Sequence, residues 1–237
     1  MKISVVVPTY NEEKGIEGFL RQFKNQTLPR NEFQIIIVDG NSKDKTREIA
    51  KKYADKVILQ KSQGVGGARN DGVTIAEADI IATTDSDILV SHTWLEQIIN
   101  HFEKDKELVL VYGSNYPMTK RKDIKFFAML KRWMNIVGTG LHLLDFAEGT
   151  NTAFRKKPFL EVGGYSDLPF LDDMEVTFRI KKKGKIKYDG SIFIYASTRR
   201  IEKHGVSDIG LDGLKAYIQL IFGKESKKLK QYAKQEY

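Results

Sequence analysis

The run Ile80-Ile81-Ala82-Thr83-Thr84-Asp85-Ser86-Asp87 places two carboxylates directly after a short apolar segment. Such a segment is typical of a buried strand, and open α/β sheets bind ligands at the carboxyl ends of their strands. Two hard oxygen ligands one residue apart suit Mg2+ or Mn2+, whose other positions water and phosphate oxygens can fill. The run indicates either a metal site for a diphosphate at Asp85 and Asp87 or an ordinary turn, because Asp and Ser are frequent in turns.

Three further apolar runs also end in polar residues. The runs at residues 3–7, 33–38 and 57–59 lead to Pro8-Thr9-Tyr10, to Asp39, and to a glycine-rich stretch that contains Arg69. Helix-compatible segments separate the runs, and strands that alternate with helices form a parallel sheet with helices on both faces. The glycines permit a close approach of the backbone, and the Arg69 guanidinium offers a planar fork for phosphate. We therefore expect a Rossmann-like, mostly parallel α/β sheet whose polar strand ends converge on one edge.

Composition agrees with one enzyme-sized domain. The chain has 237 residues, 41% of them hydrophobic, and can bury a substantial core. It contains no cysteine, which excludes disulfides and thiolate metal sites. Its first residues enter a strand without the basic and apolar regions of a secretory signal, so we expect a cytoplasmic protein.

The formal net charge of +8 comes from several basic clusters, among them residues 224–234. No aromatic and glycine module of the kind found in RNA binders accompanies these clusters, so we expect no nucleic-acid partner. Lysine clusters beside amphipathic helices fit an anionic membrane surface, and a plain solvated face is the alternative.

One segment carries apolar residues at three- and four-residue steps, which predicts one apolar helical face: Phe126, Leu130, Trp133, Val137, Leu141 and Leu144. Lys131 and Arg132 interrupt it well short of the ~20 apolar residues that a bilayer span needs. We expect this helix to pack on the core, with an interfacial or lipid-acceptor-binding helix as the alternative. Residues 214–222 repeat the pattern, so we expect an amphipathic helix and a basic tail at 206–237.

Seven sequence motifs between residue 3 and about residue 184 follow one another in a specific order. They are Val7-Pro8-Thr9-Tyr10-Asn11-Glu12, Val38-Asp39-Gly40-Asn41-Ser42-Lys43-Asp44-Lys45-Thr46, Gly67-Ala68-Arg69-Asn70-Asp71-Gly72, Asp85-Ser86-Asp87, Gly149-Thr150-Asn151-Thr152-Ala153-Phe154-Arg155, Gly163-Gly164-Tyr165 and Leu171-Asp172-Asp173-Met174-Glu175. In this order the chain resembles family 2 glycosyltransferases, the nucleotide-diphospho-sugar transferases of the GT-A fold. The resemblance implies a GT-A domain at 1–205, with a nucleotide-sugar half at 1–115, an acceptor half at 116–205 and a C-terminal helical extension at 206–237.

The resemblance also implies a donor site. The residues that it places around the nucleotide are Pro8, Thr9, Tyr10, Glu12, Asp39, Arg69, Asp85, Ser86, Arg199 and Arg200. The first three would line the base, Glu12 would lie near the ribose, and Asp39 would bind the base edge. Arg69 would steady the base or the diphosphate, and Arg199 and Arg200 would clamp the diphosphate.

A divalent ion, Mn2+ or Mg2+, is the cofactor that the resemblance implies. Asp87 would hold the ion, and Asp85 would reach the ribose or the metal through water. His204 follows late in the chain, where some related enzymes place a metal-binding histidine. A surface histidine is the alternative for His204.

The pair Asp172-Asp173 is the candidate for the general base. The family usually has Glu-Asp here, with the second carboxylate as the base, so Asp173 is the first candidate and Asp172 its rival. Helix N-capping is the alternative, because Asp is a preferred capping residue. A carboxylate that faces the sugar opposite the diphosphate favours single displacement with inversion.

The expected reaction is transfer of a sugar from a nucleoside diphosphate, a UDP-sugar first of all, to a sugar or lipid-linked acceptor. We expect peripheral contact with the inner face of the membrane, and a homodimer as a further partner state. A sugar nucleotidyltransferase is one alternative, although its glycine-rich phosphate loop belongs after the first strand, where this chain has Pro8-Thr9-Tyr10-Asn11. A non-catalytic membrane- or sugar-binding module is another, but it would not need both Asp87 and Asp173.

Overall fold

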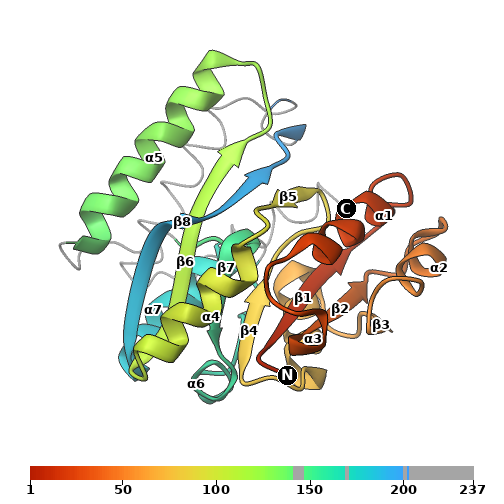
Figure 1. Cartoon of the computed structure of the whole chain (residues 1–237), viewed down its shortest axis with the longest axis horizontal. Helices are drawn as coiled ribbons and strands as arrows, with labels where there is room; N and C mark the ends of the chain where they lie inside the picture. The colour runs from red at the N-terminus through yellow and green to blue at the C-terminus, as the bar shows by residue number, and fades with distance from the viewer. Residues whose placement is uncertain (141–146, 169–170, 200–201, 203–237) are drawn as a thin grey trace.

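The computed structural model describes residues 1–140, 147–168, 171–199 and 202 (Figure 1). Their strands are β1 (Ile3–Thr9), β2 (Phe33–Asp39), β3 (Lys56–Leu59), β4 (Ile80–Thr83), β5 (Ile88–Val90), β6 (Leu108–Pro117), β7 (Thr152–Arg155) and β8 (Lys185–Ala196). These strands form one sheet in the order β3-β2-β1-β4-β7-β6-β8-β5. The first four strands are parallel, whereas β7 is antiparallel to both neighbours and β5 is antiparallel to β8. The predicted α/β sheet is therefore confirmed, with antiparallel pairing added in its second half.

Helices cover both faces of the sheet. They are α1 (Ile16–Arg21), α2 (Thr46–Ala50), α3 (Gly64–Ile75), α4 (Trp94–Lys104), α5 (Lys122–Gly140), α6 (Lys156–Glu161) and α7 (Asp172–Ile180), with short 3-10 turns η1 (Gln22–Asn25), η2 (Arg30–Glu32), η3 (Gly149–Asn151) and η4 (Lys181–Lys183). Side chains of α1, α2 and α4 belong to one apolar cluster, and side chains of α3, α6 and α7 belong to the other. The sheet thus lies between two helical layers.

Residues of β1 alternate between these two clusters. Val5 and Val7 belong to the cluster that contains Trp94 of α4, whereas Val6 belongs to the cluster that contains Val73 of α3. Successive side chains of a strand point to opposite faces, so a strand buried on both faces is apolar throughout. This explains why the strand signal in the sequence is a continuous apolar run.

The carboxyl ends of the parallel strands meet at one edge. Thr9 of β1 pairs with Asp39 of β2, and Asp39 pairs with Leu59 of β3. The glycine-rich stretch that follows β3 lies in the first turns of α3. A Cβ on Gly66 would lie 2.3 Å from an oxygen of Asp172, so the close approach at this glycine is made by a carboxylate of the same chain.

The expectation that the helix near residue 126 packs on the core is wrong for its described part. Phe126, Leu130 and Trp133 are 63%, 43% and 61% exposed, and α5 projects away from the two layers (Figure 1). The cause is β6, whose residues 114–117 continue beyond β7, pair with β8 and carry α5 past the helical layers. None of the described helices has both the length and the apolar character needed to cross a bilayer. Leu141, Leu144 and the expected helix and tail at 206–237 lie outside the described residues.

Candidate active site

Asp85 is held by protein groups on both of its carboxylate oxygens. The buried Arg69 donates from Nη2 to Asp85 Oδ1 at 2.9 Å, and Thr150 Oγ1 donates to Asp85 Oδ2 at 2.8 Å. The Arg69 guanidinium also lies 5.6 Å from the centre of the Tyr165 ring. A Cβ on Gly149 would lie 2.5 Å from the guanidinium, so only glycine leaves room for Arg69 there.

Asp87 and Glu12 both accept hydrogen bonds from the guanidinium of Arg199. Nη2 of Arg199, an exposed side chain after β8, donates to Glu12 Oε1 at 2.8 Å and to Asp87 Oδ2 at 2.9 Å. The hydrogen bonds that Arg199 donates to Asp87 and then to Glu12 raise the pKa of Arg199. Three residues expected at the donor site, far apart in sequence, therefore meet at one point.

The two carboxylates of the Asp172-Asp173 pair open α7 and have different surroundings. Asp173 is half-buried and accepts the backbone N–H of Gly149 at 2.9 Å. Asp172 is buried, and its Oδ2, which faces Gly66, has no hydrogen-bond partner among the described residues. Neither aspartate is the N-cap, because Leu171 occupies that position with a φ of 62°.

Burial raises the pKa of both aspartates. For Asp172 burial and then the neighbouring Asp173 outweigh the opposing charge of Arg69 and raise the pKa to about 6. For Asp173 burial also raises the pKa, while the Gly149 N–H and Arg69 oppose the shift and Glu148 adds to it. A carboxylate that titrates near neutral pH is suited to general acid–base chemistry. The pair can therefore accept a proton at the edge where Asp85 and Arg69 lie.

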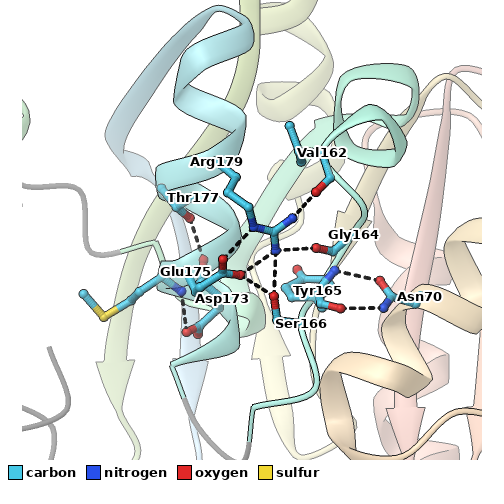
Figure 2. A network of polar contacts seen from close by, with 10 residues as sticks. Asn70, Val162, Gly164, Tyr165, Ser166, Asp173, Glu175, Thr177 and Arg179 are labelled. Carbon is cyan, nitrogen blue, oxygen red and sulfur yellow. Dashed lines mark hydrogen bonds and ion pairs between the residues drawn. The ribbon is translucent and has the colours of Figure 1, made fainter. Parts of the chain in front are cut away.

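A network around Arg179 of α7 fixes the preceding turn (Figure 2). The Arg179 guanidinium donates to the carbonyls of Val162 and Gly164, to Ser166 Oγ, and to both carboxylate oxygens of Glu175. Ser166 Oγ donates in turn to Glu175. This turn is thus tied to the helix that begins with the aspartate pair.

Asn70 of α3 ties the same turn to Arg69. Its amide accepts the Tyr165 N–H at 2.9 Å and donates to the Tyr165 carbonyl at 2.8 Å (Figure 2). Gly164 has a φ of +70°, and a Cβ there would lie 2.5 Å from Asn70 Oδ1. Because α3 and α7 are both bound to this turn, Arg69 and the aspartate pair are held in a fixed relation.

The expected base-lining residues lie at the end of β1. Pro8 is half-buried, Thr9 is buried, and Tyr10 is 54% exposed. Thr9 Oγ1 has no hydrogen-bond partner among the described residues. The exposed Tyr10 ring is a group that a ligand at this edge can contact, whereas the unpaired Thr9 hydroxyl is buried.

Asp39 is fully buried and already has protein partners. It accepts Ser42 Oγ at 2.5 Å and Ser42 N–H at 2.9 Å, and it pairs with Arg47 at 3.4 Å. Ser86 is buried between the two aspartates of its motif. The expected site residues Arg200 and His204 lie outside the described residues.

The carboxylates of Asp87 and Glu12 could supply some, but not all, of the ligands of a hard divalent ion. The oxygens of Asp87 and Glu12 both lie within 2.9 Å of one guanidinium nitrogen, so they can share a cation. Within the described part of the chain no group of three or more acidic or histidine side chains is placed to hold a metal. An ion at Asp87 would therefore take its remaining ligands from water and a diphosphate, which is how proteins commonly bind Mg2+.

Sequence reasoning assigned no role to Glu148 or to the turn Gly149-Thr150-Asn151. Glu148 accepts hydrogen bonds from Asn115 and Lys131 and lies close enough to Asp173 to raise its pKa. Asp85 was marked because it follows an apolar run, whereas this turn precedes β7 and reaches Asp85 only because β7 runs antiparallel to β4.

Asn151 joins this turn to the rest of the fold. Its Nδ2 donates to the carbonyls of Ser114 at 3.1 Å and Ile192 at 3.2 Å, and Trp94 Nε1 donates to Asn151 Oδ1 at 2.9 Å. The turn that binds Asp85 and Asp173 is thereby anchored to α4, β6 and β8.

Residues 4–163 match the model of the family described as glycosyl transferase family 2. The match covers more than half of the chain, and the chain belongs to this family.

Two relatives resemble the chain over different lengths. The poly(ribitol-phosphate) beta-N-acetylglucosaminyltransferase of Staphylococcus aureus is 36% identical over 124 residues, which is 48% of this chain and 22% of that protein. The glucosyl-dolichyl phosphate glucuronosyltransferase of Haloferax volcanii is 30% identical over 178 residues, which is 70% of this chain and 56% of that protein. The chain thus spans between about a fifth and just over half of these relatives.

Solved structures share the fold. The S. aureus enzyme in complex with UDP-GlcNAc has a TM-score of 0.69 at 23% identity, over 84% of this chain and 59% of that one. A mannosyltransferase from Pyrobaculum calidifontis in complex with GDP-Man and Mn2+ has a TM-score of 0.69 at 20% identity, over 86% of this chain and 59% of that one. At these identities the likeness shows the GT-A fold alone.

Proposed function

We propose that the chain transfers a sugar from a nucleoside diphosphate, a UDP-sugar first of all, to a hydroxyl acceptor with inversion at the anomeric carbon. The observation that carries the proposal is the Asp172-Asp173 pair, whose pKa values are raised, beside the Arg69–Asp85 ion pair at the carboxyl edge of the sheet. Relatives solved with UDP-GlcNAc and with GDP-Man support a nucleotide-sugar donor.

Asp173 is the proposed base. Asp173 is half-buried and its carboxylate is oriented by the Gly149 N–H, whereas Asp172 is buried against Gly66. The acceptor oxygen attacks the anomeric carbon, its proton passes to Asp173, and the bond between the anomeric carbon and the diphosphate oxygen breaks. Attack from the face opposite the diphosphate inverts the configuration.

The proposed donor contacts are those at the strand ends. Thr9 and Tyr10 would meet the base, Asp85 the ribose, and Arg199 the diphosphate. The proposed cofactor is Mn2+ or Mg2+ at Asp87, and when bound it would neutralise part of the charge of the leaving diphosphate. Asp85 and His204 remain proposed ligands of the same ion, the latter outside the described residues.

The proposed division of the chain is a GT-A domain at 1–205, with donor and acceptor halves that meet at residue 115, and an extension at 206–237. We also propose a cytoplasmic protein that contacts the inner face of the membrane and takes a lipid-linked acceptor. The exposed apolar stripe of α5, formed by Phe126, Leu130 and Trp133, supports this contact. A homodimer stays a prediction.

UDP binding and UDP-GlcNAc hydrolysis, with water as the acceptor, test the proposal. We expect Mn2+ to strengthen UDP binding, and Asp173→Asn to slow hydrolysis by ~10²–10⁴-fold while UDP affinity stays near that of the wild type. Asp172→Asn is the matched variant and should slow the reaction less. If Asp172→Asn is the inactive variant, the two roles are exchanged, and if neither UDP nor GDP binds with Mn2+ present, the proposal is wrong.

A further inference from the structure

A groove of about 390 Å3 lies between α5 and the projecting ends of β6 and β8. The residues that define its chemistry are Asn115, Tyr116, Lys125, Met129, Arg132 and Tyr195. It combines aromatic and apolar walls with two cations, and no acidic residue lines it. Ligand sites are commonly built in this way, from apolar walls and a few placed polar groups.

The two cations of the groove have no carboxylate to neutralise them. Lys125 and Arg132 lie on the same face of α5, and neither forms an ion pair with any residue that the structure describes. Their neighbour Lys131 differs, because it pairs with Glu148. The Arg132 guanidinium lies over the Tyr116 ring at 5.5 Å, which holds it at the groove wall. Two unpaired cations in one groove select an anionic ligand.

Aromatic rings form the wall opposite α5. Tyr116 and Tyr195 line the groove with their ring centroids 5.8 Å apart, and Tyr195 is 44% exposed. Each ring centroid also lies 5.8 Å from that of Phe193, which is not a lining residue. A tyrosine of this kind offers an apolar ring face together with a polar hydroxyl. Such a wall accommodates the carbon skeleton of a sugar, a polyol or a prenyl chain next to a charged group.

The groove reaches the proposed base through a short chain of contacts. Asn115 at the groove donates to Glu148, and the next residue, Gly149, donates its N–H to Asp173. Asn115 Oδ1 is buried and has no hydrogen-bond partner among the described residues. Glu148 and Gly149 thus link the groove to Asp173.

We infer that this groove is the acceptor site and that the acceptor carries a phosphate bound by Lys125 and Arg132. The inference deepens the proposed function and rests on it for the reaction, but the binding that it states can be measured without a donor. The phosphate can belong to a lipid headgroup or to a soluble phosphorylated polyol, and both present the same anion to α5.

Calorimetric titration of the full chain tests the inference with four probes. Geranyl phosphate and glycerol 3-phosphate represent the two sources, and geraniol and glycerol are their neutral counterparts. The groove variant is Lys125→Ala with Arg132→Ala, and the matched control is Lys120→Ala with Lys122→Ala, which removes the same charge from exposed positions outside the groove.

We expect the wild type to bind a phosphate probe at least ~10-fold more tightly than its neutral counterpart, since a charge-assisted hydrogen bond contributes about that factor. The groove variant should lose ~10-fold or more, the control should stay within about twofold, and added salt should weaken binding. Binding of geranyl phosphate alone assigns the lipid source, and binding of both phosphates assigns a soluble one.

Equal affinity of the groove variant and the control overturns the inference, as does equal binding of phosphate and neutral probes or no binding of any probe. Titration of UDP with Mn2+ on the same samples separates the two failures. Normal UDP binding without phosphate binding overturns the groove assignment alone, whereas loss of UDP binding in the wild type overturns the proposed function.

Discussion

The adjacent carboxylates of Asp172 and Asp173 lie near the buried Arg69, which already pairs with Asp85. Folding stability should therefore depend on pH. Asp172 ionises near pH 3.8 in the unfolded chain, whereas burial and Asp173 raise its pKa to about 6 in the folded chain. Between these values only the unfolded chain releases the proton. The contribution of Asp172 to folding stability is therefore complete below pH 4 and is lost as the pH rises to about 6.

Asp172→Asn should remove this loss, because the amide does not ionise. We expect the variant to be more stable than the wild type at pH 7.5 by up to about 3 kcal/mol, and the difference to vanish below pH 4. Urea unfolding at the two pH values measures it. Asp167→Asn, an exposed aspartate of the preceding loop, is the control and should change stability equally at both. A variant that gains nothing at pH 7.5 would show that Asp172 is ionised without cost.

At the scale of elements, the apolar runs were sufficient to predict the parallel strands and the carboxylates at their ends. β1, β2 and β4 are buried on both faces, so their apolar residues follow one another directly at 5–7, 35–38 and 80–82, and the carboxyl end of each strand is where that run stops. The position of α5 could not be predicted in this way. Periodicity shows that Phe126, Leu130 and Trp133 share a face, but what covers that face depends on how far β6 extends past its neighbours. Glu148 was missed for a related reason, because antiparallel β7 is what brings it to the site.

The hydrogen bonds that Arg179 donates to residues 162–166 should hold α7 in place. Arg179→Ala leaves the carbonyls of Val162 and Gly164 without their side-chain donor and removes the cation beside the Glu175 carboxylate, so we expect the free energy of unfolding to fall by about 2–3 kcal/mol. Thermal or urea unfolding measures this change.

Arg21→Ala is the matched control for Arg179→Ala. Arg21 also pairs with a glutamate four residues earlier, Glu17, but this pair lies on the exposed face of α1, so its loss should cost no more than about 0.5 kcal/mol. Equal losses in the two variants would mean that the carbonyl contacts of Arg179 contribute nothing.

At the scale of the whole molecule, α5 sets an apolar stripe apart from the two helical layers. We expect the protein to bind vesicles that contain anionic lipid, with Phe126 and Trp133 inserted at the interface. Phe126→Ser with Trp133→Ser should weaken partition by at least ~10-fold, because burial of a large apolar side chain contributes about 1.5–3 kcal/mol. Sedimentation with vesicles of varied composition measures the partition.

Leu59→Ser with Leu160→Ser is the control for the stripe, since both leucines are about half exposed and lie away from α5. This variant should partition like the wild type. The membrane proposal is wrong if the wild type binds no vesicles or if the stripe variant binds as well as the control. The apolar stripe of α5 would then be interpreted as a contact surface for another protein.

The turn Gly149-Thr150-Asn151 has a consequence for recombining such proteins. It lies in the half of the chain that follows residue 115, yet Thr150 binds Asp85 and a carbonyl within the turn binds Thr83, both in the half that precedes it. A chimera that exchanges the second half between two homologues would therefore bring a foreign turn to the native Asp85. Exchanging only residues 118–140, which include α5, leaves the hydrogen bonds of the turn to Thr83 and Asp85 intact. With the acceptor groove placed along α5 as inferred above, we expect such an exchange to change acceptor preference while the turn at Asp85 stays native.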